Sequence, residues 1–391
     1  MDRKTLLDWL KLTQVPGLGP VGIGRLLDHF GQPEAVLEAN EQGLSQVPGI
    51  RPALVAALNH FRQATPPEPI NHHLDRLHHL GGTVLIRGGK HYPPLLATIH
   101  DPPPVLFVLG DPVHLQGEQA IAVVGSRRAS RQAVQFAQTL AQDLAQNQIT
   151  TVSGLALGID SAAHRGALSG KGPTIAVIAT GLDVDYPPGN RGLKEEILAQ
   201  GCLITEAPLG TQPAPYLFPP RNRIISGLSQ GVVVVEAAPR SGSLITARLA
   251  LEQGREVFAV PGSGAYGDSR AKGVNNLLRQ GAVLVEGVAD ILQELSWSLP
   301  TQRISSPHPE REEQQPHQEK LSEKKNMSHE NITIIKQLED GPLLADELAR
   351  KCQLTVASLS RILLQLELTG VVERLPGNQY ALLRGAGSPL K

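Results

Sequence analysis

Eight short apolar runs follow one another between residues 84 and 290, separated by segments of helical character. Their hydrophobicity is continuous rather than alternating, as in IAVVGS and GVVVVEA, which is typical of strands covered on both faces. Such strands occur mainly in parallel sheets with helices on either side, so the sequence predicts an α/β region with an extended Rossmann-like, mostly parallel sheet. The predicted strands are 105–110, 121–126, 150–155, 174–180, 202–207, 231–237, 256–262 and 282–287.

Two similar phrases interrupt the helical pattern of residues 1–64, VPGLGPVGIGRLL at 15–27 and VPGIRPALVAAL at 47–58. In each, Val-Pro-Gly is followed by a Pro or Gly that can open a helix, an order that resembles a tandem helix-hairpin-helix. A glycine turn at a helix start exposes backbone N–H groups that can hold a DNA phosphate. The same glycines can instead serve only the tight turns. Residues 1–64 are therefore predicted to form a SAM-like helical domain, with DNA binding left open.

The carboxyl-terminal third changes character twice. Residues 298–329 hold few large apolar side chains and many charges, which predicts a disordered linker. Residues 330–391 then read as two helices, a longer third helix and two strands joined through PGN, the order of a winged helix. Seven Lys and Arg oppose seven Asp and Glu there, whereas a DNA-reading winged helix is usually basic. A protein-contact role for residues 330–391 is at least as well supported. The Rossmann-like domain, which lies between the helical domain and the linker, is predicted to span residues 70–297.

The overall charge is close to zero, because 36 Lys and Arg oppose 37 Asp and Glu. Any site for an anion must therefore be local rather than spread over the surface.

Cys202 and Cys352 stand far apart in the sequence and suggest neither a disulfide framework nor a metal cluster. No run of about 18 apolar residues occurs. We expect a cytoplasmic protein with no metal, no cofactor and no membrane segment. Aromatic residues make up 3% of the chain, which argues against a long row of stacking rings.

Glycine-rich turns follow most of the predicted strands and precede helices. In an open parallel sheet, ligands bind outside the carboxyl ends of the strands, and such turns can form nests for phosphate. Neither GSRRAS nor GALSGKG has the spacing of a dinucleotide or ATP motif, so no nucleotide cofactor is predicted. The candidate phosphate partners near these turns are Arg127, Arg128, Arg221, Arg223, Arg240 and Lys272.

Arg221 and Arg223 stand close to a valine run that is predicted to be buried. A guanidinium is permanently charged and its fork of donors suits a phosphodiester, but it is costly to bury without a partner. One interpretation places both side chains at the rim of an anionic groove. The other gives them structural salt bridges to residues such as Glu206 and Glu236.

Seven stretches between about 90 and 287 resemble the bacterial DNA-processing protein A (DprA/Smf) family: HYPPLLATIHDPPPVLFVLG, IAVVGSRRAS, SGLALGIDSAAHRGAL, TIAVIATGLDVDYPPGN, FPPRNRIISGLSQGVVVVEA, SGSLITARLALEQGREVFAVPG and KGVNNLLRQGA. The resemblance implies a non-enzymatic, sequence-independent single-stranded DNA binding protein. It would protect incoming DNA and load a RecA-type recombinase onto it during natural transformation and recombination. It also implies a homodimer built through the Rossmann-like domain.

The family's DNA-binding positions transfer by motif to nine residues of this chain. They are Gly125, Ser126, Arg127, Gly154, Phe218, Arg221, Asn222, Arg223 and Lys272. Phe218 would be the ring available to stack on a base. The dimer and recombinase contacts have no motif that can be transferred in this way.

Two other functions remain open. SGSLITA, after a strand ending in Glu236, loosely resembles the signature of Rossmann-like phosphoribohydrolases, which would make the protein an enzyme on a phosphorylated nucleoside or sugar. No Ser-His-Asp set or close carboxylate pair accompanies it. An adapter whose terminal domains only dock partners would bind no DNA at all.

Overall fold

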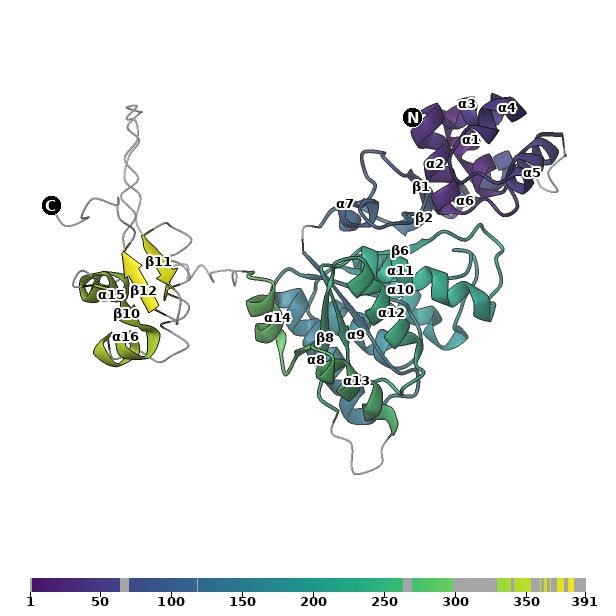
Figure 1. Cartoon of the computed structure of the whole chain (residues 1–391). Helices are drawn as coiled ribbons and strands as arrows, with labels where there is room; N and C mark the ends of the chain where they lie inside the picture. The colour runs from purple at the N-terminus through teal and green to yellow at the C-terminus, as the bar shows by residue number, and fades with distance from the viewer. Residues whose placement is uncertain are drawn as a thin grey trace, which may run out of the picture. The chain divides into compact units, whose positions relative to one another are not determined.

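The chain forms two compact units, Met1–Arg303 and Ile304–Lys391, in a computed structural model (Figure 1). The predicted linker lies outside the described residues, apart from His329. The boundary predicted between residues 64 and 70 falls inside the first unit and stays a prediction. The structure describes residues 2–63, 70–117, 119–262, 269–297, 329–338, 341–352, 359, 362–363, 366, 371–375 and 379–382.

The first unit begins with six helices, which include the expected tandem helix-hairpin-helix. The two hairpin turns place Gly17 and Gly49 at φ angles of 76° and 81°, a conformation that favours glycine. The helix after each turn begins at a proline, Pro20 and Pro52, whose fixed φ suits the first helical position. The helices are α1 (Arg3–Thr13), α2 (Pro20–Phe30), α3 (Pro33–Glu38), α4 (Glu41–Ser45), α5 (Pro52–Gln63) and α6 (Ile70–His79).

A nine-stranded sheet follows within the described residues, in the order β1-β2-β6-β5-β4-β3-β7-β8-β9. The seven strands from β6 to β9 in that order are parallel, and β1 and β2 add an antiparallel edge. All eight predicted runs form strands, and β1 was not predicted. The strands are β1 (Gly82–Ile86), β2 (Val105–Gly110), β3 (Ala120–Val124), β4 (Thr150–Ser153), β5 (Thr174–Val177), β6 (Cys202–Thr205), β7 (Gly231–Val234), β8 (Glu256–Ala259) and β9 (Val283–Leu284).

Helices cover both faces of the sheet, which explains why the strands are continuously apolar. On β3, Ile121 and Val123 pack with α8 and α9, whereas Ala122 and Val124 point into the cluster with α11 and α12. The fold class is therefore confirmed as Rossmann-like. The helices of this region are α7 (Pro94–Ala97), α8 (Arg131–Gln146), α9 (Ile159–Ser169), α10 (Arg191–Gln200), α11 (Phe218–Gly227), α12 (Gly242–Glu252), α13 (Ser269–Arg279) and α14 (Val288–Glu294).

The amino-terminal helices share a hydrophobic core with the antiparallel edge of the sheet. Leu10 of α1 and Leu74 of α6 belong to the same buried cluster as Val105 and Phe107 of β2. His73 of α6 reaches further and accepts a hydrogen bond from the backbone N–H of Leu209 at 3.2 Å. These contacts explain why the six helices and the sheet form one compact unit.

The second unit has the winged-helix order that was expected. Its described elements are α15 (His329–Leu338), β10 (Leu343–Leu344), α16 (Ala345–Cys352), β11 (Val372–Leu375) and β12 (Gln379–Leu382), with the strands in the order β10-β12-β11. Most of the predicted third helix and the PGN turn lie outside the described residues. Four residues of that helix, Leu359, Ile362, Leu363 and Leu366, are described and buried. Across the parts of the chain that the structure describes, every helix is too short or too polar to span a bilayer.

Candidate nucleic-acid interface

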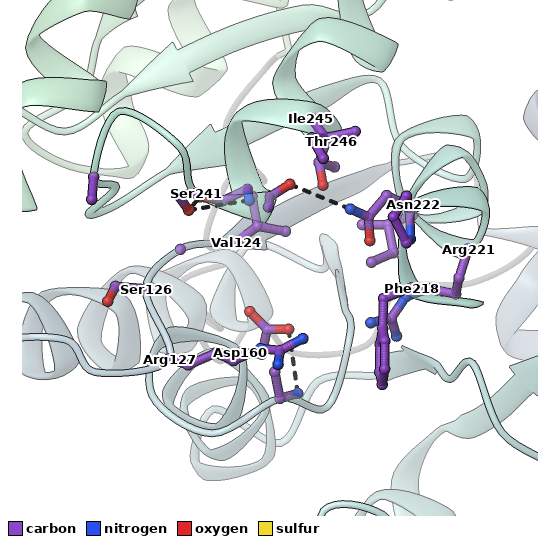
Figure 2. Close-up of a pocket in the computed structure, with 17 residues that line it drawn as sticks. Val124, Ser126, Arg127, Asp160, Phe218, Arg221, Asn222, Ser241, Ile245 and Thr246 are labelled. Carbon is purple, nitrogen blue, oxygen red and sulfur yellow. Dashed lines mark hydrogen bonds between the residues drawn. The ribbon is translucent and has the colours of Figure 1, made fainter. Parts of the chain in front are cut away.

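A cleft of about 300 Å³ opens at the carboxyl ends of β3 and β7 (Figure 2). The chain proceeds from β3 through β4, β5 and β6 on one side, then returns to place β7 and β8 on the other. The cleft therefore lies at the topological switch point, where doubly wound sheets bind their ligands. The predicted Gly125, Ser126 and Arg127 form one wall, and Phe218, Arg221 and Asn222 form another.

Three helices direct their first turns at the cleft. Asp160 lies in the first turn of α9, α11 begins at Phe218, and Gly242 and Ser243 open α12. The N–H groups of a first turn lack partners within the helix and carry its positive dipole end. Asn222 Nδ2 donates to the backbone oxygen of Gly242 at 3.3 Å, which ties α11 to α12 across the cleft. The positive dipole ends of these helices therefore favour an anion in the cleft, although Pro219 and Pro220 in the first turn of α11 have no N–H to donate.

Arg127 supplies the exposed cation of the cleft. It forms no salt bridge among the described residues, and its Cζ lies 5.2 Å from the centroid of the Phe218 ring. This distance is within the range of a cation–π contact, which orients the guanidinium without neutralising it. The close approach of Gly125 to α9 fixes the preceding turn, because a Cβ there would lie 2.6 Å from Ile159 Cγ1. Arg127 is thus held beside the ring and remains available to a phosphate.

Arg221 lies deeper, with its residue only 7% exposed. Its Nη1 donates to the carbonyl oxygen of Gly154 at 2.9 Å and also to that of Val177, so the guanidinium joins the ends of β4 and β5. Burial lowers its pKa to about 10, opposed by the nearby Asp160 carboxylate. Arg221 therefore stays charged at neutral pH and lines the cleft floor. Its Nη1 donates to backbone carbonyl oxygens and so is not available to a ligand.

Asp160 faces the same floor, and sequence reasoning did not single it out. Its Oδ2 accepts from the backbone N–H groups of Gly154 and Ala156 at 3.2 and 3.3 Å. Burial raises its pKa to about 6, against the opposing effect of Arg221. Gly154 is needed here for close approach, since a Cβ would lie 2.8 Å from Asp160 Oδ2 and 2.9 Å from Arg221 Nη2. The cleft therefore contains a buried acid among its cations.

Arg223 does not line this cleft and is already paired. Its Nε lies 3.0 Å from Asp101 Oδ2, and its Nη2 lies 2.7 Å from Glu206 Oε1. Its side chain is 7% exposed. Of the two interpretations of this arginine, the geometry favours the structural salt bridge, since its charge is compensated by two carboxylates. Direct contact of Arg223 with DNA stays a prediction that this geometry does not favour.

The remaining predicted cations lie on the surface outside the cleft lining. Arg128 and Arg240 are exposed, as is Lys272 on α13. The helix that carries Lys272 passes close to the segment after β7, because Gly273 N donates to Ala237 O at 2.9 Å. Lys272 is thus placed at the same edge of the sheet but is not brought into the cleft.

Glu236, the candidate acid–base residue, is buried and supports the fold. Both of its carboxylate oxygens lie 3.2 Å from the backbone nitrogen of Ser130, the residue that caps α8. Glu236 does not line the cleft.

Ser241 lines the cleft and caps α12 with its side chain, and sequence reasoning did not single it out. A serine before a helical run is a common helix-start signal, so the sequence did offer a way to find it.

Comparison with known proteins assigns all three parts of the chain. The family described as DNA recombination-mediator protein A matches residues 83–296, the DprA winged helix domain matches 314–378, and a SAM-like helix-hairpin-helix tandem matches 10–58. Protein Smf of Synechocystis sp. is 32% identical over 95% of this chain and 97% of its own length. Protein Smf of Escherichia coli is 38% identical over 81% of this chain and 79% of its own length.

The fold comparison agrees with the sequence comparison. The X-ray structure of DNA processing protein A from Streptococcus pneumoniae matches with a TM-score of 0.63 and 36% identity, covering 73% of this chain and 97% of that chain. The family match spans the strands and turns that build the cleft. With more than half of its length in one family match and near-complete coverage of a relative, this chain belongs to the DNA recombination-mediator protein A (DprA/Smf) family.

Proposed function

We propose that the protein binds single-stranded DNA without sequence preference and has no enzymatic activity. In this role it protects incoming strands and loads a RecA-type recombinase onto them during natural transformation and recombination. The observation that carries the proposal is the cleft at β3 and β7, where the exposed Arg127 stands against Phe218 among three helix starts. Family membership supports the same process, since the relatives are named DNA processing proteins.

The chemistry of the cleft supports recognition of the DNA backbone rather than of particular bases. Backbone N–H groups and guanidinium groups bind phosphate oxygens, which are identical along the strand. A ring beside them adds stacking, which tolerates every base because each has a π face. The net charge of the chain is close to zero, so attraction for the strand must come from local charges such as those of the cleft. We therefore propose DNA contacts for the six predicted residues that line the cleft, Gly125, Ser126, Arg127, Phe218, Arg221 and Asn222. Gly154 does not line the cleft, and its contact with DNA stays a prediction.

Replacing Arg127 by Ala tests the proposal. We expect affinity for single-stranded oligonucleotides of every sequence to fall by about tenfold, because a charge-assisted hydrogen bond to phosphate is lost. The slope of log affinity against log salt should flatten by about 0.7, the value for one phosphate contact with a single strand. Fluorescence anisotropy at two salt concentrations measures both quantities.

Arg128→Ala is the matched control. Arg128 is the neighbouring exposed arginine, and it does not line the cleft. Its replacement removes the same charge from the chain and should change affinity by less than about twofold, as expected of a charge beyond the contact surface. Equal losses in the two variants would show that only overall charge matters, and unchanged binding in Arg127→Ala would reject this cleft as the DNA site.

Recombinase loading and the homodimer rest on the family resemblance and need their own tests. Loading is measured as faster assembly of a RecA-type recombinase on a single strand that is already covered by a single-strand binding protein. Analytical ultracentrifugation measures the dimer. The absence of catalysis is supported by Glu236, whose carboxylate is engaged with the backbone of Ser130.

A further inference from the structure

A groove of about 290 Å³ lies between α8 and the turn before α14, and it shares no lining residue with the cleft. Six residues of α8 form one wall, and their spacings of three and four place them on a single face of the helix. They are Gln132, Gln135, Phe136, Thr139, Leu140 and Asp143, and Glu286 and Gly287 form the other wall. The groove is therefore a separate feature of the surface that follows about three turns of one helix.

Both walls of this groove are fixed by the fold. Leu140 is 2% exposed and belongs to the same buried cluster as Ile291 of α14, which holds the two helices against each other. Asp290 holds the turn before α14, because its Oδ2 accepts from the backbone N–H groups of Glu286 and Gly287 at 2.7 and 3.0 Å. The groove is therefore preformed, and a ligand binds there without the cost of ordering its walls.

The groove combines an aromatic ring with uncompensated negative charge. Phe136 is only partly buried against the core, so part of its ring faces the groove. The carboxylates of Asp143 and Glu286 form no salt bridge among the described residues, and no Lys, Arg or His of those residues lines the groove. A phosphate would be repelled here. Gln135 and Thr139 add neutral groups that can both donate and accept hydrogen bonds, as the backbone of a peptide requires.

A peptide with one apolar and one basic side chain has the complementary chemistry. Phe136 and Asp143 are separated by seven positions of α8, which is about 10 Å at a rise of 1.5 Å per residue. An extended chain covers this distance in about three residues.

We propose that the groove docks an extended segment of a partner protein in which an apolar residue and a Lys or Arg lie three positions apart. The apolar side chain contacts Phe136, and the carboxylates of Asp143 and Glu286 attract the cation. This role is separate from DNA binding and does not depend on it.

Two fluorescein-labelled peptides test the groove, one with the core Leu-Ala-Ala-Arg and one with the core Arg-Ala-Ala-Leu, which together cover both chain directions. The full-length protein should bind at least one of them with a Kd below about 1 mM, measured by fluorescence anisotropy. Replacing the Leu of that peptide by Ala should weaken binding about tenfold, since an apolar contact is lost. Replacing its Arg by Gln should weaken binding about threefold, as expected of a partly exposed ion pair.

Glu286→Gln removes one charge from the groove and keeps the shape of the side chain. It should weaken binding of the Arg-containing peptide about threefold and leave binding of the Gln-containing peptide unchanged, which separates charge pairing from an effect on the fold. Glu196→Gln is the matched control, because Glu196 is exposed on α10 and lies outside the groove. This control should bind both peptides as the wild-type protein does.

Phe136→Ala provides a second variant, which should weaken binding of both peptides about tenfold, with its fold checked by circular dichroism. The inference is overturned if neither core binds, or if Glu286→Gln and Glu196→Gln weaken binding of the Arg-containing peptide equally. It is also overturned if Phe136→Ala turns a dimer into a monomer in analytical ultracentrifugation, since a second copy of the chain would then occupy the groove.

Discussion

At the scale of single residues, the surroundings of each charge decide its role. Arg127 and Arg223 are the same amino acid and both were candidates, yet one is exposed in the cleft and the other is enclosed by Asp101 and Glu206. Burial also raises the pKa of the Asp160 carboxyl. The motifs single out positions, whereas the availability of a charge depends on neighbours that are distant in sequence.

Asp160 predicts that DNA affinity depends on pH. Its pKa is raised by burial from 3.8 to about 6, so the folded protein holds a proton in a window where the unfolded chain has released it. This group therefore makes the folded state less stable as pH rises from about 4 to about 6. A phosphate in the cleft raises the pKa further, so binding takes up a proton. Affinity should rise as pH falls from 8 towards 6, measured by anisotropy at constant ionic strength.

Replacing Asp160 by Asn should remove this dependence. The amide is neutral at every pH, and its oxygen can still accept from Gly154 and Ala156. Asp143→Asn is the control, since Asp143 lies on α8 outside the cleft. A pH profile that is as steep in Asp160→Asn as in the wild-type protein would assign the proton to another group.

At the scale of elements, the buried arginine ties a helix to its surroundings. Arg223 on α11 joins the carboxylate of Glu206, just after β6, to the carboxylate of Asp101, which precedes β2.

The eight predicted strands were recognisable because both faces of each are buried, which leaves a continuous apolar run. Strand β1 has a mixed burial pattern and pairs only with β2 at the edge of the sheet, so its five residues carry a weaker signal.

Replacing Arg223 by Met should lower the free energy of unfolding by about 3–5 kcal/mol, because two carboxylates lose their shared counter-charge in a largely buried place. Chemical denaturation followed by circular dichroism measures this loss. The control is Arg248→Met on α12, where the arginine side chain is 70% exposed and pairs with Glu252. That exposed pair should contribute less than about 1 kcal/mol.

The DNA affinity of correctly folded Arg223→Met should stay within about twofold of the wild-type value. A large loss of binding at unchanged stability would restore the interpretation in which this arginine contacts phosphate.

At the scale of the whole molecule, the cleft lies entirely within the first compact unit. The core that joins the amino-terminal helices to the antiparallel edge makes residues 1–297 a self-contained part of the chain. The winged unit has its own core, built from α15, α16 and the four described leucine and isoleucine residues between α16 and β11. Among the described residues, each unit therefore has a hydrophobic core of its own.

A chain that ends after Trp297 should therefore fold and bind single-stranded DNA with an affinity within about threefold of the full-length value. The small change is expected because seven positive and seven negative side chains in residues 330–391 nearly cancel. Anisotropy with the same oligonucleotide measures it, and circular dichroism checks the fold. A loss of tenfold or more would place part of the DNA site in the winged unit.

The sequence by itself determined the parallel sheet, the paired hairpins, the winged order and the two motifs that contain Arg127 and Phe218. These are local properties, because apolar runs and glycine turns depend on residues that are close together in the sequence. Only the tertiary structure decided that Arg223 is neutralised by Asp101 and Glu206 and that Asp160 lies in the cleft floor. Burial and charge compensation arise when distant segments meet, and the strength of every electrostatic contact depends on that meeting.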